Sequence, residues 1–230
     1  MNRLLAVARL HLMVPARAFG LPWGIMTLAW ALSVALFASF GDNGDVVIVG
    51  GLFSLYVILF LSAEQAVTRT LSFALALGAT RRAFYLGTCG FLAAQALAAG
   101  AVLAVLRAVE RGTGGWGTRL SFFDVPYLVG GNPVQAAAAY AASLALVCAA
   151  GLAAGSVTRR WGTVGTSVLS AAAIVVPGVA VWWISAAGGL APLGNWLAGQ
   201  PAFALRTLWP LGFATVLAAI GWTAVRRTPA

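Results

Sequence analysis

Long apolar runs without charged residues divide the sequence, and arginines or acidic residues stand at the boundaries between them. A helix needs about 20 apolar residues to cross a hydrocarbon core about 30 Å thick. Applied to these runs, the rule predicts an all-α membrane protein with one transmembrane domain over residues 1–230. The six predicted spans lie at about residues 21–40, 46–63, 83–106, 134–156, 161–183 and 207–225.

Two shorter elements are predicted outside the spans. The residues from Asn2 to Phe19 combine a helix-forming composition with basic side chains, which predicts an N-terminal interfacial helix. Between the fifth and sixth spans, the run from Ile184 to Leu205 is broken by several Gly and Pro residues and predicts short outer helices. Pro133 suits the first turn of the fourth span, because proline is favoured at that position of a helix.

The connection between the second and third spans is more than a short loop. Three apolar side chains recur there every four residues and form one helical stripe, namely Val67, Leu71 and Leu75. Gly78 is placed to end this short helix, and Thr80 is the expected N-cap of the third span. Arg81 and Arg82 then fall in a first helical turn, where the helix dipole disfavours positive charge. They either anchor the topology or contact a cytosolic partner.

The arginines predict the orientation. Six crossings put both termini on one side, and ten of the 14 basic residues, all of them Arg, lie in the termini and loops of that side. The other four are Arg107, Arg111, Arg119 and Arg206. Because loops that face the cytoplasm carry the excess of basic residues, both termini are expected to be cytoplasmic.

Composition excludes several kinds of chemistry. The chain is 61% apolar and 8% charged, and its net charge of +9 is better explained by topology than by nucleic-acid binding. Without lysine it has no P-loop lysine for a nucleotide, and a single histidine, His11, cannot build a two-histidine metal site. Cys89 and Cys148 lie in separate apolar runs and lack the paired spacing of a metal-binding or redox motif. We therefore expect no catalytic residue, metal or cofactor on this chain.

The run SFALALGATRRAFYLG and the six-span layout, with the N-terminal surface helix and the apolar segment before the last span, resemble permease subunits of type-two ATP-binding-cassette exporters. The short permeases of high-GC bacteria are the most similar. The resemblance implies a location in the bacterial cytoplasmic membrane and export driven by ATP and Mg²⁺ on a separate, dimeric cytosolic ATPase. It also implies pairing with a second permease copy or a paralogue.

In that family, the loop between spans two and three carries a coupling helix that docks on the ATPase. The resemblance implies that this helix covers Thr70 to Gly78 here. The implied coupling residues are Thr70, Leu71, Ser72, Phe73, Leu75, Gly78, Arg81 and Arg82. Glu64 could pair with one of these arginines or with Arg69 to form a charge network on the inner side.

A substrate path is less defined by the sequence. Phe53, Tyr56 and Phe60 share one face of the second span, and in the resembled family spans two and five line the corridor. An amphiphilic or hydrophobic substrate, such as a drug, lipid or peptide, would suit such a face. Packing on another helix or on lipid is the alternative. Pro177 is expected to kink the fifth span.

Two other functions stay open. An ion-coupled secondary carrier usually needs an acid buried in the membrane, and Glu64 at a span end is the nearest candidate. A non-transporting membrane scaffold or immunity protein would associate with no ATPase. Gly151 and Gly155 form a GxxxG motif, which predicts close helix packing within the chain.

Overall fold

The computed structural model describes residues 19–40, 47–48, 50–126 and 128–227. In these ranges, five helical segments are long and apolar enough to cross a membrane, at Leu21–Ser39, Gly50–Ala76, Arg81–Gly112, Pro133–Ala186 and Ala204–Arg226. The chain is therefore a multi-pass membrane protein with an all-α fold. The N-terminal interfacial helix expected from Asn2 lies almost entirely outside the described residues.

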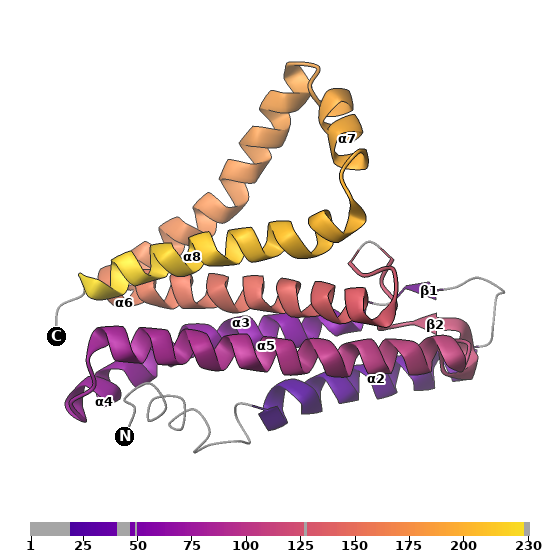
Figure 1. Cartoon of the computed structure of the whole chain (residues 1–230), viewed down its shortest axis with the longest axis horizontal. Helices are drawn as coiled ribbons and strands as arrows, with labels where there is room; N and C mark the ends of the chain where they lie inside the picture. The colour runs from indigo at the N-terminus through magenta and orange to yellow at the C-terminus, as the bar shows by residue number, and fades with distance from the viewer. Residues whose placement is uncertain (1–18, 41–46, 49, 127, 228–230) are drawn as a thin grey trace.

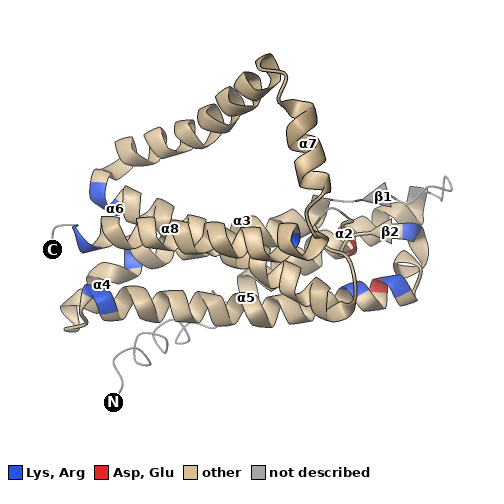
Figure 2. Cartoon of the chain, turned by 45° about the horizontal axis from the view of Figure 1, so that its top comes forward, with Lys and Arg blue, Asp and Glu red and all other residues tan. Residues whose placement is uncertain are grey.

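The helices and short strands follow one another as α2 (Leu21–Phe40), β1 (Val47–Ile48), η2 (Gly50–Leu52), α3 (Phe53–Gln65), η3 (Ala66–Thr70), α4 (Leu71–Ala76), α5 (Arg81–Gly112), η4 (Gly115–Arg119), β2 (Leu120–Ser121), α6 (Pro133–Ala186), α7 (Leu190–Ala198), η5 (Ala204–Leu208) and α8 (Trp209–Arg226). Most helices lie side by side along the long axis (Figure 1). We call the two ends of this bundle the α4 end and the strand end. Figure 2 shows that basic residues gather at these two ends.

Capping residues explain where the central helices begin. Thr80 accepts a hydrogen bond from the Ala83 N–H (3.2 Å) and starts α5, as predicted. At α6, the Asn132 side chain accepts from the Gln135 N–H (2.9 Å), and Pro133 occupies the first turn. α5 extends beyond the predicted span of 83–106 at both ends. At its C-terminal end, the side chains of Arg107, Glu110 and Arg111 bind the loop that follows.

The predicted start of the second span at about residue 46 is wrong. Val47 and Ile48 form a two-residue strand that pairs in parallel with Leu120 and Ser121. The α-helix begins only at Phe53, after the single turn η2. Two successive glycines stand at the start of that turn, and the high conformational entropy of glycine disfavours a longer helix there.

The predicted fourth and fifth spans correspond to the two helical halves of α6, which meet at Gly162. α6 is 54 residues long and contains one residue with non-helical backbone angles, Gly162, at φ 66° and ψ −155°. This backbone conformation is almost confined to glycine. At the break the chain doubles back, and the second half of α6 leaves the bundle at an angle (Figure 1). The reversal therefore needs one residue and no loop.

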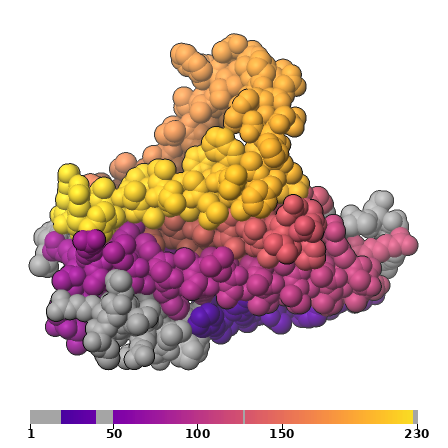
Figure 3. Space-filling view, viewed as in Figure 1, coloured from indigo at the N-terminus to yellow at the C-terminus, as the bar shows by residue number. Residues whose placement is uncertain are grey.

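The second half of α6 and α7 project from the bundle (Figure 3). Their side chains are almost all exposed and strongly apolar, including Ile174, Val176, Trp182 and Trp183. α7 is a short helix in the segment where short helices were expected. Such a surface needs lipid or another protein chain around it.

Small residues bring the remaining helices close together. The first half of α6 packs against α3, α5 and α8. A Cβ atom on Gly155 would lie 2.6 Å from the Glu64 carbonyl oxygen of α3, and one on Gly100 would lie 2.7 Å from the Ala141 backbone nitrogen. The GxxxG motif thus packs within the chain, as predicted, with Gly151 against the backbone of Phe60.

This close approach predicts that Gly155→Ala destabilises the protein. The added methyl group would push α3 away from α6, and overpacking of this kind costs about 1–3 kcal/mol. We expect a lower midpoint of thermal unfolding for the variant purified in detergent. Gly90→Ala in α5 is the matched control, since nothing lies within 4 Å of its Cβ position. Equal midpoints of thermal unfolding for the two variants would contradict the close packing of Gly155 against α3.

Candidate functional site

A short helical turn closes the bundle at the α4 end. α3 continues through η3 into α4, and the chain then turns at Gly78, whose φ is +81°. The Gly78 N–H donates to the Leu75 carbonyl (2.9 Å), and the Ala79 N–H donates to the Ala74 carbonyl (3.0 Å). These two bonds form a Schellman motif with Gly78 in the left-handed position. The predicted end of the helix at Gly78 is therefore confirmed.

The turn has a buried face and an exposed face. Val67, Leu71 and Ala74 are fully buried, so the predicted apolar stripe holds the turn against the bundle, although Leu75 is only half-buried. On the other side, Phe73 and Leu77 are 56% and 63% exposed. They lie four residues apart and, with the exposed Arg69 and Ser72, form what we call the α4 surface.

Arg159 links the α4 surface to the reversal of α6. Its Nη2 atom donates to Ser72 Oγ at 2.6 Å, and its Nη1 atom donates to the Thr68 carbonyl at 3.5 Å. Arg159 stands three residues before Gly162. From the sequence this arginine appeared only as a topology signal, since no local pattern indicates a contact across 87 residues.

The two arginines at the start of α5 have different surroundings. Arg81 Nη1 donates to the Arg226 carbonyl at the end of α8 (3.4 Å). The C-terminal end of α8, where the helix dipole is negative, thus lies against the positive charge of Arg81. The dipole of α5 disfavours this charge, because Arg81 stands at the N-terminal end of α5. Arg82 lines a groove between α5 and α8 together with Trp222. No ion pair joins Glu64 to an arginine within the described ranges.

The residues expected to line a substrate path do not gather around one cavity. Tyr56 is buried, and its hydroxyl lies 2.9 Å from Ser143 Oγ of α6. Phe53 is 69% exposed, whereas Phe60 is half-buried beside α6. Pro177 is exposed in the projecting half of α6. Tyr56 thus joins two helices of the bundle, as the packing alternative predicted.

A second polar cluster organises the strand end. The Glu110 carboxylate accepts hydrogen bonds from the backbone N–H groups of Phe122, Phe123 and Asp124, at 2.7–3.1 Å, and from Trp116 Nε1 at 2.9 Å. Glu110 is only 2% exposed. Because both of its oxygens already accept several bonds, this carboxylate holds the loop and is not placed to act as a base.

Asp124 completes this cluster. Arg107 and Arg111, one turn apart on α5, each donate to one of its carboxylate oxygens at 2.7 Å. The Tyr140 hydroxyl of α6 donates to the Phe123 carbonyl in the same loop. The sequence did not reveal this cluster, because fourteen positions separate Glu110 from Asp124.

The described residues contain no group of three or more His, Cys, Asp or Glu side chains that could hold a metal ion. Cys89 is half-buried and Cys148 is buried, and both are free thiols. No family model, curated protein or solved structure matches the chain. The function of the chain must therefore be inferred from the geometry of the α4 surface and from the sequence.

The ion pairs of Asp124 predict acid-dependent stability. Burial alone would raise its pKa, but the hydrogen bonds from Arg111 and Arg107 and their charges outweigh that effect and hold the pKa below the ordinary carboxyl value. A lowered pKa in the folded state stabilises the protein above the unfolded pKa, about 4, and this contribution is lost as the pH falls through the folded value.

We therefore expect Asp124→Asn to lower the unfolding midpoint in detergent at pH 7, because it leaves the buried Arg107 uncompensated, at a cost of about 3–5 kcal/mol. The difference between the variant and the wild type should shrink as the pH is lowered from 7 to 3. A difference that stays constant across this range would show that the ion pairs of Asp124 do not stabilise the fold.

Proposed function

We propose that this chain is the permease subunit of an ATP-driven exporter and that the α4 surface docks on a separate ATPase. The observation that carries the proposal is a short helix held at the end of the bundle with two large apolar side chains, Phe73 and Leu77, directed outward. A lipid-facing segment would explain exposed apolar groups, but Arg69, Arg81 and Arg82 beside them favour a position at the membrane surface.

The proposed topology has six crossings. The reversal at Gly162 divides α6 into two segments of spanning length, and α7 lies on the far side, before the last crossing. The arginines at the α4 end then face the cytoplasm of a bacterium, together with both termini, while Glu110 and Arg206, which bind the loop before α6, lie outside. In this orientation, the α4 surface is accessible to a cytosolic partner.

The proposed partner supplies what the chain lacks. Without lysine, the chain has no P-loop, so ATP and Mg²⁺ would bind to the ATPase dimer. Arg159 would pass a movement of α4 to α6, because its guanidinium contacts Ser72 and stands next to the reversal. A second permease copy or a paralogue, together with lipid, would cover the projecting half of α6. An amphiphilic or hydrophobic substrate suits these apolar surfaces.

The proposal predicts that Phe73→Asp abolishes association with the ATPase. A carboxylate in place of an exposed apolar anchor would have to be desolvated at the interface, and the loss of such an anchor costs about 2 kcal/mol or more. We would purify the tagged protein from its native membrane in mild detergent. Mass spectrometry would then identify a co-purifying chain with nucleotide-binding motifs, and its ATP hydrolysis would be measured.

Leu197→Asp is the matched control, since Leu197 is also exposed, at 40%, but lies on α7, away from the α4 end (Figure 1). It should retain the ATPase at the wild-type ratio. Arg81→Glu with Arg82→Glu should reduce the amount of ATPase recovered while the protein stays folded. Recovery of the wild-type protein without any ATPase would favour an ion-coupled carrier or a scaffold and would refute the exporter proposal.

A further inference from the structure

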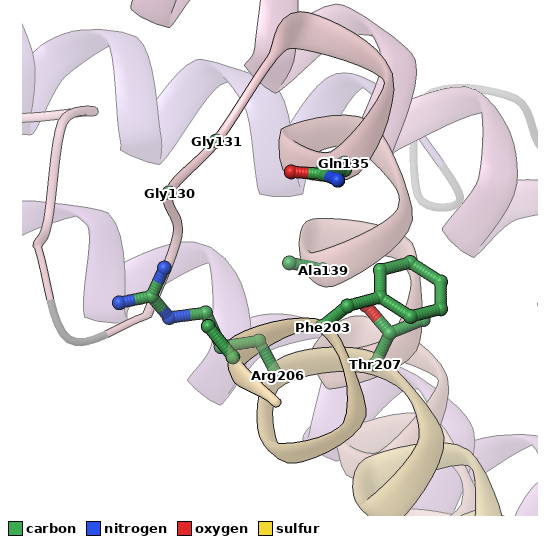
Figure 4. Close-up of a pocket in the computed structure, with 8 residues that line it drawn as sticks. Gly130, Gly131, Gln135, Ala139, Phe203, Arg206 and Thr207 are labelled. Atoms are coloured by element: carbon green, nitrogen blue, oxygen red, sulfur yellow. The ribbon is translucent and has the colours of Figure 1, made fainter. Parts of the chain in front are cut away.

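A small cavity lined by both apolar and polar groups lies at the strand end, between the loop before α6 and the start of the last membrane-spanning segment (Figure 4). Its volume is about 110 Å³. The polar part of its lining consists of Gln135 on the first turn of α6, Arg206 and Thr207 on η5, and the backbone of Gly130 and Gly131. The cavity has no part in the proposed docking of an ATPase.

Arg206 brings a positive charge to this cavity. Its Nη2 atom donates to the Pro126 carbonyl at 2.9 Å, which fixes the guanidinium beside Gly130. A Cβ atom at residue 130 would collide with Nη1, so the absence of a side chain there leaves room for the charge. The bond to Pro126 uses one of the five N–H donors of a guanidinium. None of the described residues that line the cavity carries a carboxylate.

The second glycine makes room for the amide of Gln135. A Cβ atom on Gly131 would collide with Gln135 Oε1, and its φ of +71° disfavours any other residue. Gln135 Oε1 therefore lies against the Gly131 backbone, and the amide nitrogen of this lining side chain carries two N–H donors. The missing side chains of Gly130 and Gly131 thus leave space that Arg206 Nη1 and Gln135 Oε1 occupy.

Thr207 supplies the observation that points to a ligand. Its side chain lines the cavity and the residue is 5% exposed, yet Oγ1 has no hydrogen-bond partner among the described residues. A threonine in a helix ordinarily donates to the carbonyl four residues before it, as Thr158 does here at 2.9 Å. A buried hydroxyl without a partner is unfavourable, and an acceptor in the cavity would satisfy it.

We propose that this cavity binds a phosphate-sized oxyanion. The Arg206 guanidinium supplies the charge, and the Thr207 hydroxyl and the Gln135 amide donate hydrogen bonds to its oxygens. Planar guanidinium groups suit phosphate oxygens in particular, and charge-assisted bonds of this kind are about twice as strong as neutral ones. Among the described residues, the acids at the same end, Glu110 and Asp124, are engaged by other groups, and no ion pair joins a carboxylate to Arg206. The phosphate belongs either to a lipid headgroup or to a free anion.

Isothermal titration of the full chain in a non-ionic detergent tests this assignment. The probes are inorganic phosphate and two short-chain lipids, dihexanoyl phosphatidylglycerol and dihexanoyl phosphatidylcholine. Binding of inorganic phosphate as tight as that of the lipids identifies a free anion as the ligand. Tighter binding of phosphatidylglycerol, displaced by high concentrations of phosphate, identifies a lipid headgroup. Failure of all three probes to bind the wild-type protein overturns the proposal.

Two variants locate the site. Arg206→Gln should weaken binding by about tenfold or more, because it removes the charge. Thr207→Val has nearly the same shape and should weaken binding about three- to tenfold without lowering the unfolding midpoint, since the hydroxyl has no partner to lose. Thr207→Val therefore decides the test even where Arg206→Gln fails to fold.

Arg119→Gln is the control for unspecific attraction. Arg119 is exposed and directly precedes β2 at the strand end, so the variant removes an equal charge outside the lining of the cavity. It should bind the probe within about twofold of the wild type. Equal weakening by Arg119→Gln and Arg206→Gln, or unchanged binding by Thr207→Val, would show that the oxyanion does not occupy this cavity.

Discussion

Backbone N–H and C=O groups need hydrogen-bond partners within the protein when they lie in hydrocarbon. This constraint determines where the chain can change direction. The helices of the bundle run almost without interruption between its two ends, and the breaks fall where water or charged groups can satisfy the exposed backbone. Gly78 turns the chain at the α4 end through two backbone hydrogen bonds. Gly162 reverses it at the same end through its own unusual backbone angles. The charged residues gather at the ends for the same reason.

The two ends are built differently. At the strand end, a buried carboxylate accepts hydrogen bonds from one loop, and two arginines pair with an aspartate of that loop, so most polar groups there have partners. At the α4 end, single arginines reach carbonyl or hydroxyl oxygens of neighbouring helices, as Arg159 and Arg81 do. The first arrangement fixes a loop against the bundle. The second joins α6 to α4 and α5 to α8 by a few contacts and leaves an apolar surface open.

Much of this architecture follows from local sequence. The first span was predicted at 21–40 and is observed at Leu21–Phe40, since apolar length alone decides it. Thr80, Gly78 and Pro133 mark helix ends because capping depends on near neighbours. Contacts between distant residues were not predictable: the pairing of β1 with β2, the carboxylate clamp at Glu110 and the bond from Arg159 to Ser72 all need the fold. The boundary between the fourth and fifth spans was predicted just before residue 161 and is observed at Gly162.

Because the helix is broken at one residue, Gly162, the second half of α6 can rotate about that residue as a rigid segment. The segment from residue 163 to 186 is a rod about 36 Å long at 1.5 Å per residue, and its side chains are mostly exposed. A rotation of about 10° at its base would displace its tip by about 6 Å, the length of one helical turn. A rotation near Arg159 would thus be amplified toward the far end of this segment, with no helix unwinding.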